Sequence, residues 1–541
     1  MAYSSLSFLV FLTAVIAVYY LVPKKHQWFV LLVASYGFYL SSGLEHVVYI
    51  LFTTLFSYGA GRWMQKIRDD LAASVKALGD GVTKDQKREM KKEATKKIHR
   101  IQVATVLVNL GILAYVKYLN FFIGSFNQMF ALFRWDASMP LVNVLVPLGL
   151  SYYTFNSVGY LIDVGRGKYD AEKHLGKFAL FVSFFPSIVQ GPLNRYADVG
   201  MQLQQPHDFD YDNVKYGAQL MLWGFFKKLV IADRVAVIVA TIFAPDYVNY
   251  QGHHIFFGVL AYSMQIYCDF SGGTDITRGA AQMMGINLPE NFARPFFATS
   301  MADFWRRWHM SLGAWMREYV FYPVMLSKPV TAVSKTFRQK YGAHIGKIVP
   351  SVAAPMVVFF LMNIWHGLSA QRILNALYNA LIISSTVALT PAYKKLGEKL
   401  RVNTEAFSFR LFQMLRTFAL LCVSRILTHA PSLEAALQML KTLVRDRVFL
   451  TISGLDFFLG SGGEIFSFGV NEREMLVLFL SILTLLVVGI LQERGVKIRE
   501  TLSKQGIIFR WGMILLLVLV VLVFGVYGPG YNARAFIYGG Y

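Results

Sequence analysis

Two histidines are the residues of this sequence best placed for proton-transfer chemistry. His366 ends the apolar run APMVVFFLMNIWH, and His309 lies in FWRRWHMSLGAW among three tryptophans. An ionisable side chain at membrane depth is costly and usually has a function, and burial favours the neutral imidazole, which accepts a proton. His366 is therefore a candidate general base, and a histidine bonded to a neighbouring helix is an equally good interpretation of its position alone.

Helical spacing across 303–324 predicts one amphipathic helix at the membrane interface, because tryptophans favour that region. Four side chains then share its apolar face: Trp305, His309, Leu312 and Met316. In the simpler interpretation the helix is an anchor and His309 is structural. In the sharper one His309 faces a reaction chamber, and Arg306 and Arg307 lie near an anionic acyl donor.

A third polar group comes at the end of an apolar run. Asp269 is followed by Gly272 and Gly273, where we expect the helix to break. Pairing with a basic side chain explains a buried acid more often than catalysis does. The sequence has no HExxH, P-loop or GxSxG motif, and Cys268 and Cys422 lie inside apolar runs. We therefore expect no metal centre and no disulfide framework.

The composition is that of a membrane protein. Of 541 residues 55% are hydrophobic and 16% charged, and apolar runs about as long as a bilayer is thick exclude a soluble enzyme or a disordered chain. The net charge of +21 fits basic cytoplasmic loops better than nucleic-acid binding. We expect an all-α polytopic protein of about eleven transmembrane helices, with the lipid bilayer and no nucleic acid as partner. Broken apolar segments such as 178–193 and 215–243 suit re-entrant pieces.

The order of charges predicts how the chain is oriented. Residues 6–22 are apolar and precede Lys24 directly, so the positive-inside rule places the N-terminus outside the cytoplasm. The segment 62–100 is rich in lysine and arginine and is predicted to be a basic helical segment in the cytoplasm. We find no internal repeat and no low-complexity linker. Residues 1–541 are therefore expected to form one multi-pass domain in the inner or plasma membrane.

The histidine segments occur together with further blocks that resemble the membrane-bound O-acyltransferase (MBOAT) family, in the branch of the alginate O-acetylation membrane component. The blocks follow the family's order, and the resemblance is best over 150–445. Six blocks carry it: SYYTFNSVGYLIDVGRG, FVSFFPSIVQGPLNRY, QIYCDFSGGTDITRGAAQMMGINLPENFARPF, FWRRWHMSLGAWMREYVFYP, IWHG and APSLEAALQML. The resemblance implies a ring of transmembrane helices, with re-entrant and interfacial helices, around a central tunnel. His366 would be the family's essential histidine and His309 a second histidine of this branch.

The resemblance also implies an O-acyltransferase that moves an acetyl or other acyl group from a cytoplasmic thioester to a hydroxyl. The donor would be a substrate such as acetyl-CoA or an acyl carrier, with no bound cofactor. The acceptor would be an extracellular or cell-wall polysaccharide, reached through an extracytoplasmic SGNH-like partner. His366 would deprotonate the hydroxyl, while His309 orients the substrates or donates to the developing oxyanion. Donor contacts are expected from Arg306, Arg307, Trp305, Trp308, Trp365, Asn363, Asp269 and Gln265.

Two other functions are compatible with the same sequence. Within the fold, a D-alanyl or other acyl group would be transferred to teichoic acid. In a different class, many spans with a buried histidine and a buried aspartate also describe a proton-coupled transporter or flippase. The transporter interpretation is weakened because no inverted repeat is visible.

Overall fold

The computed structural model describes residues 1–78, 83–135, 137–244, 249–446, 452–458, 460, 463–528 and 531. This part of the chain is built from helices, and its extended segments pair only at one antiparallel bridge between Phe292 and Trp308. The all-helical class predicted from the sequence is confirmed. The chain divides into two compact units, one of Met1–Ala218 with Thr277–Pro289 and the other of Gln219–Ile276 with Glu290–Tyr541. The single domain expected from the sequence stays a prediction.

The first unit consists of helices that pack around buried aromatic side chains: α1 (Leu6–Leu21), α2 (Gln27–Leu40), α3 (Val47–Ala77), α4 (Lys84–Leu132), α5 (Leu150–Arg166), α6 (Leu175–Ser183) and the first part of α7 (Tyr211–Phe225). Almost every residue of α5 is buried. After α6 the chain is irregular and buried, as predicted for 178–193. There the amide of Phe185 donates to Ser35 Oγ at 3.1 Å, and its carbonyl accepts from the Tyr3 hydroxyl at 2.6 Å. Irregular backbone inside a membrane protein needs such internal partners.

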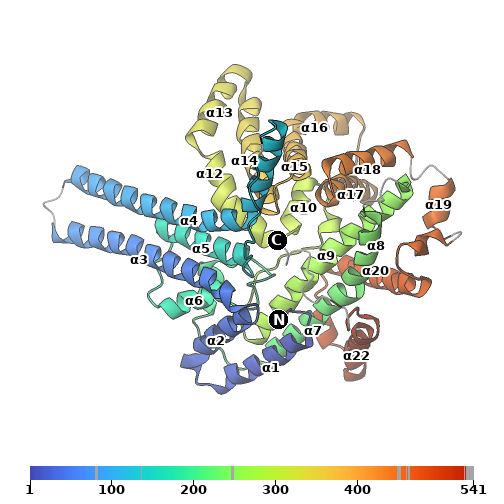
Figure 1. Cartoon of the computed structure of the whole chain (residues 1–541), viewed down its shortest axis with the longest axis horizontal. Coiled ribbons are helices and arrows are strands. Elements are labelled where there is room, and N and C mark those ends of the chain that lie inside the picture. Colours follow the sequence, from blue (N-terminus) through green and yellow to red (C-terminus); the bar gives the residue numbers. More distant parts are fainter. Residues whose placement is uncertain are drawn as a thin grey trace. The chain divides into compact units, whose positions relative to one another are not determined.

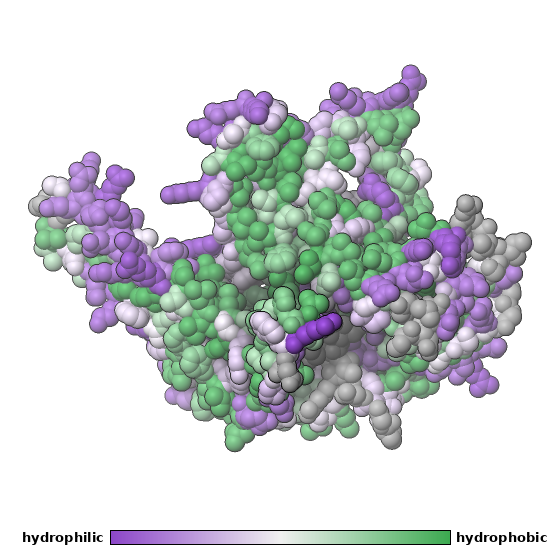
Figure 2. Space-filling model, turned by 45° about the horizontal axis from the view of Figure 1, so that its top comes forward, coloured by the Kyte–Doolittle hydropathy of each residue, from purple (hydrophilic) through white to green (hydrophobic). Residues whose placement is uncertain are grey.

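The basic segment 62–100 lies on two long helices of this unit. It covers the second half of α3 and the first part of α4, which lie side by side (Figure 1). A capping box starts α4: the Thr83 side chain accepts from the Gln86 amide, and the Gln86 side chain accepts from the Thr83 amide. Figure 2 shows hydrophilic side chains over the end of this helix pair. The described residues of the basic segment, 62–78 and 83–100, lie almost wholly in these two helices, and the cytoplasmic location stays a prediction.

The second unit carries both histidines. α14 (Ala343–Trp365), α15 (Ala370–Ala388) and α17 (Phe407–His429) pack in series. The segment 215–243, predicted from the sequence to be broken, is instead a continuous helix that is wider at the π-helical η5 (Phe226–Ala232). The unit contains the end of α7, the π-helical η5 (Phe226–Ala232), α8 (Asp233–Ile242), α9 (Gly252–Met283, as far as Ile276), α10 (Met301–Arg307), α11 (Met310–Met316), α12 (Tyr322–Met325), α13 (Lys328–Tyr341), α14 (Ala343–Trp365), α15 (Ala370–Ala388), α16 (Thr390–Lys399), α17 (Phe407–His429), α18 (Leu433–Arg445), α19 (Ile452–Phe458), α20 (Glu472–Glu493), α21 (Ile498–Ser503) and α22 (Ile507–Phe524).

The helix break expected after Asp269 is wrong, because α9 continues through Gly272 and Gly273. Gly272 packs so closely on Gly224 of α7 that a Cβ there would lie 2.8 Å from the Gly224 carbonyl oxygen. The glycine therefore serves close helix packing rather than a turn. The sequence predicts a basic partner for Asp269, such as Arg278, and the partner that the structure places there is Lys228, whose Nζ lies 2.6 Å from the carboxylate.

Fewer helices qualify as membrane spans than the sequence suggested. By length and composition, α4, α14, α17, α20 and α22 could cross a membrane, and α15 with α16, bent by 60°, could form a sixth span. The expected spans near the N-terminus include α1 and α2, which have 16 and 14 residues, whereas a straight span needs about 20. The described residues therefore support a multi-pass membrane protein, and the number of about eleven spans stays a prediction.

Candidate active site

Both predicted histidines line one cavity in the second unit. Its volume of about 80 Å³ has room for several water molecules or a small chemical group. Its walls combine apolar side chains with converging polar ones, which is typical of a ligand site. The lining comes from α9, α10, α11, α14, α15, α17 and the turns beside them: Tyr262, Ile266, Trp305, Trp308, His309, Leu312, Phe359, Met362, Asn363, His366, Arg372, Asn375, Ser424, Arg425 and Thr428.

His309 lies between α10 and α11, which corrects the prediction of one amphipathic helix over 303–324. Its φ of 45° is in the left-handed region, where a helix cannot continue. The segment containing Asn291 holds this break, because the amide of Met310 donates to the Asn291 carbonyl at 2.9 Å beside the antiparallel bridge. These bonds replace helical ones. The imidazole therefore owes its position to the Asn291 segment and not to a helical stripe.

The side chain of Asn291 also fixes the tautomer of His309. Asn291 Oδ1 accepts from the backbone amide of Ser311 at 3.0 Å, which identifies that atom as the oxygen. His309 Nδ1 lies 3.2 Å from the same oxygen and must therefore carry the shared proton, so the neutral ring has its lone pair on Nε2. Among the described residues Nε2 has no hydrogen-bond partner, and burial lowers the pKa of His309 to about 3. His309 thus brings a neutral hydrogen-bond acceptor to the cavity wall.

His366 follows the last residue of α14, at the far end of the predicted apolar helix. At about 1.5 Å per residue, the 23 residues of α14 place it roughly 34 Å along the helix axis. The next residue, Gly367, has a φ of 130° that favours glycine, and the chain turns there toward α15. Arg372 in the first turn of α15 donates to the His366 carbonyl. This contact fixes the backbone that carries the imidazole.

A chain of hydrogen-bonded amide side chains holds the polar wall of the cavity. The Trp305 indole donates to Asn379 Oδ1 at 3.2 Å, and Asn379 Nδ2 donates to Asn375 Oδ1 at 3.0 Å. Asn375 Nδ2 donates in turn to Asn363 Oδ1 at 2.9 Å. The Ser424 hydroxyl also donates to Asn375 Oδ1, at 2.7 Å. The network joins α10, α14, α15 and α17, and such bonded polar networks favour a single arrangement of the helices.

Replacing Asn375 with alanine is expected to lower the melting temperature of the detergent-purified protein. The change removes the centre of the network and leaves Asn363 and Ser424 without that partner. Interhelical polar bonds in membranes contribute about 0.6 kcal/mol each, so we expect a destabilisation of about 1–2 kcal/mol. Asn403→Ala is the matched control, because Asn403 is exposed outside the network. Equal melting temperatures for the two variants would contradict the structural importance of the network.

Two arginines of the cavity were not among the predicted site residues. The guanidinium carbon of Arg425 lies 4.7 Å from the ring centroid of Trp308 and 5.9 Å from that of Phe304, as in cation–π contacts. Arg425 is buried within α17, and Arg372 lines the cavity from α15. An arginine inside the apolar run of α17 is itself a sequence signal of function. That signal was available before the structure and could have identified Arg425.

The structure brings only some of the predicted donor contacts to the cavity. Trp305, Trp308 and Asn363 line it with the two histidines, whereas Arg306 and Arg307 do not. Both arginines pair with Asp303, and Arg307 also bonds Glu493 at 2.9 Å.

Three further predicted contacts lie outside this lining. Asp269 is held by Lys228, and Trp365 is buried with its ring 4.5 Å from that of His366. The Gln265 side-chain oxygen is buried, and within the described ranges it has no hydrogen-bond partner. The donor-binding roles of these residues stay predictions.

One group of three potential metal ligands occurs among the described residues, His253, His254 and Glu464, whose ligand atoms lie within 4.8 Å of one another. The amide of Gln251 donates to His254 Nδ1 at 3.1 Å. The neutral ring therefore carries its proton on Nε2 and donates it to Glu464 at 2.9 Å. A metal-bound histidine normally donates through its second nitrogen, which here is an acceptor. These hydrogen bonds are those of a structural cluster at the N-terminal end of α9 and do not suit a metal centre.

Comparison with known proteins adds to this geometry. The model of MBOAT, the membrane-bound O-acyltransferase family, matches residues 169–339, a range that contains His309. Probable alginate O-acetylase AlgI of Pseudomonas syringae pv. tomato is 30% identical over 81% of this chain and 74% of its own length. Peptidoglycan O-acetyltransferase of Helicobacter pylori is 26% identical over 64% of this chain and 67% of its own. Teichoic acid D-alanyltransferase of Bacillus subtilis is 31% identical over 45% and 60%.

Proposed function

The chain belongs to the membrane-bound O-acyltransferase family and is an O-acyltransferase, and from this premise we propose that it transfers an acetyl or other acyl group to a hydroxyl of an extracellular or cell-wall polysaccharide. The observation that carries the proposal is the cavity where His309, His366 and Arg425 converge. Acyl transfer to an alcohol needs a proton acceptor and a group that stabilises the carbonyl oxygen as it becomes negative. The cavity contains side chains for both tasks.

In the proposed reaction the hydroxyl oxygen attacks the carbonyl carbon of the thioester. His366 takes the hydroxyl proton as general base. Nε2 of His309 accepts a hydrogen bond from a second hydroxyl of the acceptor sugar and so orients that sugar, because the neutral ring has no proton on that nitrogen. Arg425 stabilises the developing oxyanion. When the C–S bond breaks, His366 returns the proton to the leaving sulfur.

The proposed donor is an acyl thioester on the cytoplasmic side, acetyl-CoA or an acyl carrier, which binds as a substrate. Its anionic groups would be attracted by basic cytoplasmic loops such as 62–100. Arg306, whose side chain is 68% exposed, remains a candidate donor contact. In this arrangement the N-terminus lies outside the cytoplasm, and the chain lies in the inner or plasma membrane.

The proposed acceptor follows from the names of the relatives, which mention alginate, peptidoglycan and teichoic acid. We favour O-acetylation of an extracellular polysaccharide, with an extracytoplasmic SGNH-like protein receiving the group on its way. Transfer of D-alanine to teichoic acid is the second candidate, because the Bacillus subtilis relative is 31% identical over its matched part. Family membership argues against a transporter or flippase.

Vesicles containing the purified chain test this proposal directly. Acetyl thioester labelled in its acyl group is supplied on one side, polysaccharide and the SGNH-like protein on the other, and base-labile ester on the protein and on the polysaccharide is measured. A parallel reaction uses a labelled D-alanyl thioester. The proposal expects acetyl ester in the first reaction and little ester in the second. Passage of intact thioester without ester formation would contradict the proposal and favour a transporter.

Replacing Arg425 with methionine is expected to lower kcat by about 100-fold, which is typical for the loss of one oxyanion-stabilising donor. Arg425→Lys keeps the charge and should retain more of the rate. Arg410→Met is the matched control, because Arg410 is exposed on the same helix, α17. Steady-state measurement of kcat and KM distinguishes stabilisation of the oxyanion from donor binding. Loss of oxyanion stabilisation lowers kcat, whereas a residue that only binds the donor would change KM instead. An unchanged kcat in Arg425→Met would exclude the proposed role.

A further inference from the structure

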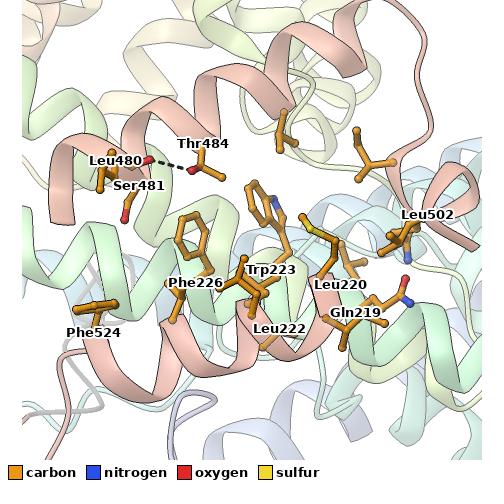
Figure 3. Close-up of a pocket in the computed structure, with 18 of the residues that line it drawn as sticks. Gln219, Leu220, Leu222, Trp223, Phe226, Leu480, Ser481, Thr484, Leu502 and Phe524 are labelled. Atoms are coloured by element: carbon orange, nitrogen blue, oxygen red, sulfur yellow. Dashed lines mark hydrogen bonds between the residues drawn. The ribbon is translucent and has the colours of Figure 1, made fainter. Parts of the chain in front are cut away.

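A second and larger cavity in the same unit is an apolar groove of about 430 Å³. It shares no residue with the lining of the candidate active site. α7 and η5 form its floor, α20 and α22 form its walls, and α21 closes one end. Figure 3 shows Trp223 and Phe226 between these walls, with Ser481 and Thr484 on α20 and with Phe524 and Leu502 toward opposite ends.

The walls of the groove are the least buried of the unit's candidate membrane spans. Within their apolar windows only 17% of α20 and 6% of α22 is buried. Both helices are long and apolar enough to cross a membrane, so their outer faces lie against lipid. The groove between them is therefore reachable by the acyl chains of that lipid.

Polar side chains gather at the end of the groove that α21 closes. Gln219, Gln492 and Arg499 line this end, whereas the middle is lined by side chains such as Leu222 and Phe226. The buried Oε1 atom of Gln219 lacks a hydrogen-bond partner in the described part of the chain. A buried amide oxygen without a partner is costly, and a ligand with a hydroxyl or ammonium group would remove that cost.

The charge of the adjoining segment is complementary to an anion. Residues 494–504 contain four basic side chains and one acidic one, Glu500, which Lys497 pairs at 3.1 Å. Basic clusters beside a membrane helix attract anionic lipid headgroups. Arg499 belongs to this segment and also lines the groove, so it links the two features.

We propose that this groove binds one anionic phospholipid of the adjacent leaflet. An acyl chain lies along Trp223 and Phe226 between α20 and α22, and the phosphate lies near Arg499. A hydroxyl of the headgroup, such as that of phosphatidylglycerol, donates to Gln219 Oε1. The bound lipid fills the space between two helices whose outer faces otherwise meet only the bulk bilayer.

Photolabelling of the full-length protein tests the proposal. The chain is reconstituted in phosphatidylcholine vesicles that contain a small fraction of phosphatidylglycerol with a photoreactive acyl chain, and the labelled peptides are identified by mass spectrometry. We expect labelling of peptides from α7, η5, α20 and α22. Leu517→Trp, which fills the groove, should lower this labelling about tenfold, because an overfilled site excludes the chain. Leu519→Trp is the matched control, because Leu519 is exposed and outside the lining.

A second variant tests the headgroup without changing the groove. Arg499→Gln should weaken competition by unlabelled phosphatidylglycerol about fivefold, whereas Arg494→Gln, in the same segment but outside the lining, should not. Equal labelling of Leu517→Trp and Leu519→Trp would overturn the proposal. Equal competition by phosphatidylcholine and phosphatidylglycerol would overturn it as well. Displacement of the probe by acetyl-CoA would assign the groove to the acyl donor instead and would also contradict a lipid site.

Discussion

Replacing His366 with alanine is expected to lower the rate of acyl transfer by about 100-fold or more. General-base catalysis contributes about 10² to 10⁴ to a rate, which corresponds to about 2.7–5.4 kcal/mol of activation free energy. His366 follows the last residue of α14 and lines the cavity outside the amide network, so truncation should leave helix packing intact. The measurement is ester formed by purified protein at saturating thioester, normalised to the amount of folded protein.

Two variants make the His366 result specific. His366→Gln keeps a hydrogen-bonding side chain but cannot carry the proton, so it should be as slow as His366→Ala. His344→Ala changes an exposed histidine in the first turn of the same helix and should behave as the wild type. A wild-type rate for His366→Ala would mean that another group takes the proton, and Nε2 of His309 would then be the next candidate.

The features that could be predicted from the sequence are those that depend on local pattern. The apolar run ending at His366 predicts a long helix with an ionisable group at its far end, and α14 has that form. The basic segment 62–100 likewise predicts helix, and its described residues lie in α3 and α4. Hydropathy and charge act on neighbouring residues in the chain, so both features are visible without any tertiary contact.

The features that the sequence did not predict depend on partners far along the chain. His309 leaves the helical pattern because Asn291, 18 positions earlier, bonds the residues around it. α9 continues through Gly272 because that glycine meets Gly224 of α7. A periodicity argument on one segment contains no information about these contacts. Only Arg425 carried a local signal, since an arginine within an apolar run is rare.

Replacing His309 with alanine is expected to lower the rate by about 100-fold, because a small loss of substrate orientation has effects of that size. The hydrogen bond with Asn291 occupies Nδ1, so the side chain acts on the cavity through Nε2 as an acceptor. Glutamine reaches the position of Nε2 with its amide oxygen and should retain more activity than alanine. Asparagine reaches only the position of Nδ1 and should be as slow as alanine.

The backbone conformation at position 309 allows the effects of the His309 variants on folding to be distinguished from their effects on catalysis. The φ of 45° at position 309 costs alanine about 1 kcal/mol, whereas asparagine tolerates the left-handed region. His309→Asn is therefore expected to melt close to the wild type and yet to be slow, which a purely structural histidine would not produce. Because the folded-state pKa is lowered to about 3, His309 stays neutral between about pH 5 and 8, and the wild-type rate should show no step from this group there. If His309→Asn were instead faster than His309→Gln, the bond to Asn291 would be the essential one, and the orienting role of Nε2 would be excluded.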